Sequence, residues 1–316
     1  MQRDKTIDNL RGAAMAAMMV IHACSYYLKD NITLIIWDNL QWAVPVFLFC
    51  SFYLFFSRTK EIKVKDFFPY LKKRLYRLLL PYFIFLAIIF PLFFIFEKKY
   101  FNLQYLFSNL FLYNGISFNW LVLLFVYLIF LMPAILMMRK NKVLFYGFFA
   151  ASLFSSIYFI FNKFNFRVIM WLPWATYAYL TLFFINNRSN KKRLFLVGLG
   201  SLFLFLALRV IEVKIGHNLT QYENKYPPTL HHLSFGVAWI VTLYGLSNTG
   251  LFNLFKFDRL LNFLSVNSYS LYFIHILVMF TLDWLNLMPP SWPIFFLEII
   301  GLTSLIQLGL NRIRKA

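Results

Sequence analysis

The sequence predicts an all-α integral membrane protein, a bundle of about ten transmembrane helices. Three properties of the composition support this fold class. The 316 residues are 61% hydrophobic and 22% aromatic, whereas a soluble domain is usually about 45–50% apolar. The mean hydropathy is +0.65, and only 14% of the residues are charged. An apolar excess of this size must face lipid, because a single water-soluble core cannot enclose it.

Apolar stretches long enough to cross a bilayer recur along the whole chain. A spanning helix needs about 20 mostly apolar residues. Such segments are expected near 10–28, 39–57, 77–96, 119–138, 143–161, 168–186, 194–211, 232–250, 267–285 and 291–310. The stretch 101–116 is apolar but short and holds several Asn and Gln residues, so it is expected to be re-entrant or interfacial. Helices are expected throughout, because an open strand in lipid leaves its backbone groups unsatisfied.

The distribution of Lys and Arg predicts that both termini are cytoplasmic. The net charge is +19, and the cations lie in short runs between apolar stretches, as in cytoplasmic loops, so no nucleic-acid partner is expected. Among the cations of the inner segments are, at the two ends of the chain, Arg3, Arg312, Arg314 and Lys315. The first apolar stretch is expected to be a retained helix, because no clear cleavage site follows it. We expect one transmembrane domain over 1–316, with no appended soluble domain.

Neither the cysteines nor the loop histidines predict a metal site. Cys24 and Cys50 lie inside apolar stretches and form no spaced set for a metal or a disulfide framework. Several metal-ligating residue types lie in or beside the predicted outer loop 212–231, but a metal needs converging ligands and the sequence shows no convergence. These residues are His217, His231, His232, Glu212 and Glu223.

The first predicted helix carries the most informative polar residues. Arg11 and His22 are eleven residues apart, which places them within roughly 20° of one helix face and about 16 Å apart along the axis. A permanent cation near the cytoplasmic interface and a titratable imidazole near mid-membrane then face one cavity, and charged residues within a span are functional candidates. The alternatives are a buried His22 bonded to a neighbouring helix and an Arg11 that extends to the interface.

The order of short motifs along the chain resembles the membrane acyltransferase-3 family. The first helix has the family's opening pattern, and four further motifs follow in order over nearly the whole chain. They are Arg3…Ile7-Asp8…Leu10-Arg11-Gly12-Ala13…His22, Val44-Pro45-Val46-Phe47…Ser51, Arg74…Arg77…Pro81, Trp120-Leu121…Tyr127…Pro133 and Asn267-Ser268-Tyr269-Ser270-Leu271-Tyr272…His275. Two positions depart from the family pattern: Phe52 stands where Gly is usual, and Asn119 stands where His is frequent.

The resemblance implies transfer of an acyl group, expected to be acetyl, from cytoplasmic acyl-CoA to a sugar hydroxyl of a cell-surface or secreted glycan. Arg74 and Arg77 would bind the phosphates of the CoA donor, since guanidinium groups match phosphate geometry; the alternative is simple positive-inside topology. His22 would act as the catalytic base or as the acyl carrier. Arg11 would orient the donor or stabilise negative charge, and Asp8 would hold Arg11. No tightly bound cofactor is expected.

Other polar residues of the spans are weaker candidates. His275 would be a second pocket histidine, or a helix-packing hydrogen bond. Ser51, Trp120 and Tyr272 are expected to shape the acceptor pocket, and Glu298 would be a pocket carboxyl or a contact between helices. Asp38, Gln41 and Asp283 stand at predicted interfaces, which accounts for their polarity; the alternative is that they contact a polar acceptor.

Two other functions remain open on the sequence alone. A transporter of a glycan intermediate or small acylated metabolite would also use aligned Arg and His residues, although no two related halves are visible. A membrane component of a polysaccharide-synthesis complex that has lost its chemistry is the third hypothesis. For the enzyme, the expected location is the inner membrane of a bacterium. The expected partners are membrane lipid, acyl-CoA, a glycan or lipid-linked sugar, and polysaccharide-synthesis proteins.

Overall fold

The computed structural model describes residues 4–162 and 164–313, and every regular element in those ranges is a helix. Contacts between Cα atoms divide the chain into two compact units. The first unit comprises the described residues of 1–51, 186–225 and 230–316, and the second comprises 52–185 and 226–229. Of the cations that predicted the orientation, Arg3, Lys163, Arg314 and Lys315 lie outside the described residues.

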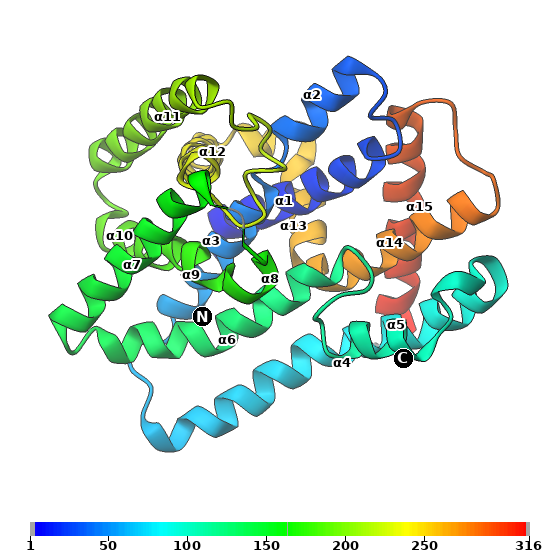
Figure 1. Cartoon of the computed structure of the whole chain (residues 1–316), viewed down its shortest axis with the longest axis horizontal. Coiled ribbons are helices and arrows are strands. Elements are labelled where there is room, and N and C mark those ends of the chain that lie inside the picture. The colour runs from blue at the N-terminus through cyan, green and yellow to red at the C-terminus, as the bar shows by residue number, and fades with distance from the viewer. Residues whose placement is uncertain (1–3, 163, 314–316) are drawn as a thin grey trace. The chain divides into compact units, whose positions relative to one another are not determined.

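The first unit is built around one N-terminal helix. It contains α1 (Lys5–Cys24), α2 (Asn31–Asn39), most of α3 (Ala43–Phe56), α11 (Lys191–Lys214), α12 (Leu230–Asn248), η2 (Leu251–Lys256), α13 (Phe257–Val266), α14 (Ser268–Trp284) and α15 (Trp292–Ile313). Helix α1 packs against α2 and against α12, α13, α14 and α15, which come from the other end of the chain (Figure 1). Most of its side chains are therefore buried by protein.

The second unit contains the middle of the chain. Its elements are the end of α3, α4 (Val64–Phe96), η1 (Lys98–Tyr100), α5 (Leu103–Leu110), α6 (Asn119–Met138), α7 (Lys142–Phe161), α8 (Phe166–Ile169), α9 (Trp171–Trp174) and nearly all of α10 (Thr176–Asn187). Helix α4 packs along α6, and α9 packs against α6 and α7. Helix α5 has only 8 residues, too short to cross a membrane, as expected for the stretch 101–116.

Seven helices of the described residues are long and apolar enough to cross a membrane, or eight if the bent pair α13–α14 counts as one span. The remaining two predicted spans correspond to α1 and α12, which do not pass this criterion. Helix α1 carries Lys5, Asp8 and Arg11, and α12 begins with a His pair. Other helices cover both of them, so neither has to be as apolar as a helix that lipid surrounds. About ten spans, and cytoplasmic termini, stay predictions.

Local sequence accounts for several differences between the expected and observed helix bounds. The Asp4 side chain accepts hydrogen bonds from the backbone N–H groups of Thr6 and Ile7, so α1 begins at Lys5 rather than near residue 10. Helix α4 begins at Val64 rather than near residue 77, because the Lys- and Arg-rich segment that precedes the apolar stretch favours helix. The span expected at 168–186 is divided into α8, α9 and α10 around Pro173.

The bend between α13 and α14 is the largest departure from the expected helices. The two helices meet at Asn267 at an angle of 87°. The sequence predicted one straight span over 267–285, and α14 alone matches it. The preceding helix α13 instead crosses α1 closely. A Cβ atom added at Gly12 of α1 would lie 2.2 Å from the Leu261 carbonyl oxygen of α13, so only glycine permits this crossing.

Candidate functional site

Helix α1 holds a charged cluster near its N-terminal end. Nη2 of Arg11 lies 3.3 Å from Oδ1 of Asp8, one turn earlier on the same helix. The Ser265 hydroxyl of α13 joins both groups: it accepts from Nε of Arg11 at 2.9 Å and donates to Oδ1 of Asp8 at 3.0 Å. The two opposite charges and the hydroxyl satisfy one another, so the cluster ties α1 to α13 and fixes the direction of the guanidinium.

At the other end of α1, His22 forms a pair with His275 of α14. Nδ1 of His22 lies 2.7 Å from Nε2 of His275 on α14, and the two rings stack at 5.0 Å with an angle of 5° between them. Tyr272 lies one turn before His275, and its ring centroid is 5.6 Å from that of His275 and 6.5 Å from that of His22. His275 is fully buried, whereas His22 is partly exposed. Three residues that the sequence proposed separately therefore meet.

The hydrogen bonds of the pair assign the tautomer of each neutral ring. Nδ1 of His275 lies 2.9 Å from the Leu271 carbonyl oxygen, which can only accept, so this nitrogen carries the hydrogen. Nε2 of His275 then has a lone pair and accepts the hydrogen on Nδ1 of His22. Nε2 of His22 consequently carries no hydrogen. The pair thus orients the proton-accepting nitrogen of the more accessible imidazole.

Lys225 is a loop residue for which the sequence predicted no site role. Its side chain is buried, and its ammonium donates to the buried Gln41 amide oxygen. Burial lowers the pKa of Lys225 to about 7, and the Asp38 carboxylate partly opposes this. The lysine is close enough for its charge to act on the His22 ring. Since Gln41 and Lys225 are distant in sequence, no local pattern indicates their contact.

A second histidine cluster is sealed within the first unit. Nδ1 of His231 on α12 lies 3.0 Å from Oε2 of Glu212 on α11, and both side chains are 0% exposed. The Phe205 ring stacks on His231 at 4.7 Å, and the Gln221 amide reaches both His231 and His232. No group of His, Cys, Asp and Glu residues in 4–162 and 164–313 is arranged to hold a metal ion.

Three further predicted site residues have contacts within their own units. Ser51 on α3 donates to the Phe47 carbonyl oxygen of its own helix at 2.8 Å. Glu298 lies partly buried on α15, and its charge acts on Tyr27. Trp120, in the second unit, packs edge-to-face on Tyr226 with 4.9 Å between the ring centroids.

The two predicted donor-binding arginines also belong to the second unit. Arg74 and Arg77 lie one turn apart on α4, and both are exposed. The Arg74 guanidinium lies 5.6 Å from the centroid of the Tyr70 ring. Two exposed guanidinium groups at this spacing present a paired surface to a phosphate.

Asn119, the position that departs from the family pattern, has a clear structural contact. Its side-chain oxygen accepts from Nη1 of Arg167 at 2.7 Å, and its amide nitrogen donates to the Asn109 side-chain oxygen at 3.1 Å. Arg167 also donates to the Leu112 carbonyl oxygen at 3.0 Å. These bonds fix the start of α6 against the turn that follows α5. The sequence predicted no site role for Arg167.

Comparison with known proteins identifies one family. The family model described as an acyltransferase domain, of the acyltransferase-3 type, matches residues 4–308. The matched range includes Asp8, Arg11, His22 and His275, and also the second unit with its arginine pair. No curated protein matches the chain, and no solved structure matches it.

Proposed function

The chain belongs to the acyltransferase-3 family and is a membrane acyltransferase, and we propose that it moves an acyl group, expected to be acetyl, from acyl-CoA to a hydroxyl of a cell-surface glycan. The observation that carries this proposal is the His22–His275 pair. An acyl acceptor hydroxyl needs a base, and a neutral imidazole supplies one. The tautomer derived above gives that role to Nε2 of His22.

The proposed reaction is direct transfer between donor and acceptor. Nε2 of His22 takes the proton of the acceptor hydroxyl while the oxygen attacks the thioester carbonyl carbon. The tetrahedral intermediate then breaks its carbon–sulfur bond, and the CoA sulfur leaves with the proton that His22 held. His275 accepts the Nδ1–H bond throughout, so it keeps the ring in position and stabilises the charge that the ring gains.

The charged groups have separate proposed roles. Arg74 and Arg77 bind the phosphates of CoA, because two exposed guanidinium groups one helical turn apart suit that ligand. Arg11, held by Asp8 and Ser265, presents a fixed cation for negative charge on the donor. The charge of Lys225 acts on His22, and we assign its ammonium to the oxyanion of the tetrahedral intermediate. In the cell we place the enzyme in the inner membrane of a bacterium.

The experiment that tests this function uses purified protein in nanodiscs with labelled acetyl-CoA. Saturable binding, and release of free CoA when a cell-surface polysaccharide preparation is added, are expected. An Arg74→Ala/Arg77→Ala variant should bind acetyl-CoA at least about tenfold more weakly, since two charge-assisted phosphate contacts are lost. The matched control is Lys72→Ala/Lys73→Ala, which removes two exposed cations from the same helix.

The same experiment separates the alternatives. A transporter would leave the thioester intact, so acetyl-CoA that survives incubation with folded protein and acceptor would contradict the enzyme assignment. Label that remains on the protein after removal of acetyl-CoA, and that disappears in His22→Gln, would instead indicate that His22 carries the acyl group. If Arg74→Ala/Arg77→Ala and Lys72→Ala/Lys73→Ala bind acetyl-CoA with the same affinity, Arg74 and Arg77 do not bind the donor specifically and serve only the membrane topology.

A further inference from the structure

The first unit contains a groove between α11 and α12. It has a volume of about 900 Å³ and is open along one side. This is the size of site that holds one small molecule, since such sites measure about 300–1,000 Å³. It is distinct from the His22–His275 pair, because none of its described lining residues belongs to α1 or α14.

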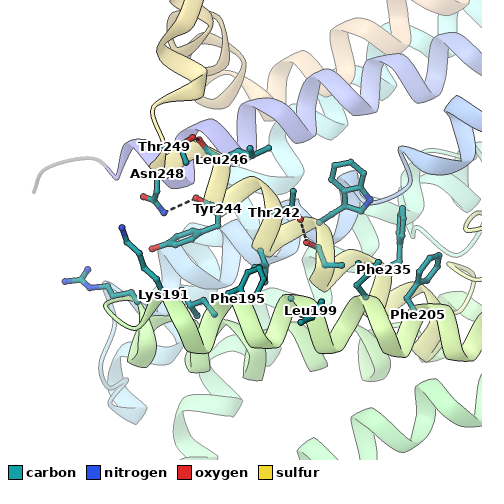
Figure 2. A pocket seen from close by; sticks show the side chains of 18 residues that line it. Lys191, Phe195, Leu199, Phe205, Phe235, Thr242, Tyr244, Leu246, Asn248 and Thr249 are labelled. Carbon is teal, nitrogen blue, oxygen red and sulfur yellow. Dashed lines mark hydrogen bonds between the residues drawn. The ribbon is translucent and has the colours of Figure 1, made fainter.

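The groove changes character from one end to the other. Arg188 and Lys191 stand at the end where α11 begins, with Asn248 and Thr249 at the end of α12. Figure 2 shows Lys191 and Asn248 toward one end of the groove and the Phe205 and Phe235 rings toward the other. None of the described lining residues is acidic. An occupant must therefore combine an anionic head with a long apolar body.

Glycines shape the groove. An added Cβ at Gly198 would come within 2.7 Å of Val241, so the two helices approach closely at this glycine. An added Cβ at Gly245, which also lines the groove, would meet nothing within 4 Å. Beside these positions Phe195, Leu199 and Leu202 are all exposed. Only 11% of the most apolar part of α11 is buried, as suits a helix in contact with lipid, so we expect the groove to open toward the bilayer.

We propose that this groove binds one anionic phospholipid of the bilayer, with its phosphate at Arg188 and Lys191 and an acyl chain along α11. The charge of the two cations complements a phosphate, and the apolar wall complements the chain. Acyl-CoA fits less well, because the amides of its pantetheine arm would lie against apolar side chains without partners. The basic end is on the predicted cytoplasmic side, where anionic lipids concentrate their negative potential.

The test measures lipid binding and needs no enzyme activity. Delipidated full-length protein in detergent is titrated with phosphatidylglycerol whose acyl chains carry bromine, or with phosphatidylcholine of the same chains. Trp239 lines the groove, so a bound brominated chain quenches its fluorescence. We expect saturable quenching that favours phosphatidylglycerol, and loss of that component in Trp239→Phe. Arg188→Gln/Lys191→Gln should weaken phosphatidylglycerol binding by about fivefold per cation removed.

Matched variants separate this site from general lipid contact. Lys192→Gln removes an equally exposed cation that does not line the groove, and it should leave binding unchanged. Gly245→Leu fills the groove and should abolish the preference, whereas Gly200→Leu, at an equally open glycine of α11 outside the groove, should not.

Three results would overturn the proposal. Equal quenching by brominated phosphatidylglycerol and phosphatidylcholine would show ordinary lipid contact only. Equal phosphatidylglycerol affinity in Lys191→Gln and Lys192→Gln would show that Lys191 does not bind the headgroup. Displacement of the brominated lipid by micromolar acetyl-CoA would assign the groove to the donor instead. The two lysine variants change only exposed side chains, so they decide the matter even if Gly245→Leu does not fold.

Discussion

The first unit has two pairs that contain histidine, and they show how a partner decides what an imidazole can do. His22 is bonded to another imidazole and stays partly exposed, whereas Nδ1 of His231 lies 3.0 Å from the Glu212 carboxylate and both side chains are fully buried. A neutral partner leaves His22 a neutral base with one nitrogen directed away from the pair. The His231–Glu212 pair is sealed between side chains of α11 and α12, where no substrate can reach it.

The surroundings of the two pairs strengthen this contrast. His22 lies in the last turn of α1, near a loop lysine. The side chain of His231 on α12 packs against α11, with the Phe205 ring stacked on it. The first arrangement suits proton transfer to a ligand, and the second suits the joining of two helices. The difference predicts that changes to one pair affect turnover and changes to the other affect stability.

The largest expected effect is on turnover at His22. His22→Gln removes the proton acceptor, and we expect acyl transfer to fall by about 10²–10⁴-fold, the usual contribution of a general base. The measurement is CoA release from acetyl-CoA in nanodiscs. His217→Gln, at a loop histidine bonded to the Asn218 carbonyl oxygen, is the matched control and should keep full activity. Near-normal turnover by folded His22→Gln protein would falsify the catalytic assignment.

The next effect concerns stability at His231. His231→Leu leaves the Glu212 carboxylate buried without its partner, which typically costs about 3–5 kcal/mol. We expect a marked fall in the thermal unfolding temperature in detergent. The protein that remains folded should keep its turnover per molecule. A double variant, His231→Leu/Glu212→Leu, should recover much of the lost stability, because no charge remains buried. If the double variant recovers no stability, the packing of the two side chains, and not the burial of a charge, determines stability at this site.

A smaller effect on turnover is expected at His275. His275→Leu removes the acceptor of the Nδ1–H group of His22, so the ring loses its fixed tautomer and orientation. We expect a loss of about 10–100-fold in turnover, with unchanged acetyl-CoA affinity. His275→Gln, whose side-chain oxygen still accepts a hydrogen bond, should recover part of the activity. A loss equal to that in His22→Gln in both variants would instead place His275 in the chemistry itself.

The last prediction is a pH dependence of stability at Lys225. Its pKa is about 7 in the folded protein and about 10.4 in an unfolded chain. Between these values the unfolded state binds the extra proton, so stability should rise with pH from about 7 to about 10 and level off beyond that range. Lys225→Met should lack this rise. The measurement is the thermal unfolding temperature of wild type and Lys225→Met at several pH values. If both proteins show the same change with pH, the pKa of Lys225 is not lowered in the folded state.

The contrast between the pairs could be drawn only partly from sequence. The chain itself indicated that His22 and His275 are polar residues in apolar surroundings, and the motif order predicted the acyltransferase-3 family, which the family match confirms. For His231 the sequence indicated only the absence of a metal pattern. Its pairing with Glu212 depends on two helices that a long loop separates, and no local periodicity reports which residues such helices bring together.

The helical membrane character, and the relations between residues of one helix, follow from the amino-acid sequence without any tertiary information. Composition and apolar run length predict lipid-facing helices, and fixed helical geometry places Asp8 beside Arg11 and Arg74 beside Arg77. The packing of the helices set the 87° angle between α13 and α14 and the close crossing of α13 at Gly12. It also brought His22 to His275 and within reach of the charge of Lys225. The physical reason is that local geometry follows from near neighbours, whereas contacts between distant residues depend on how whole helices pack.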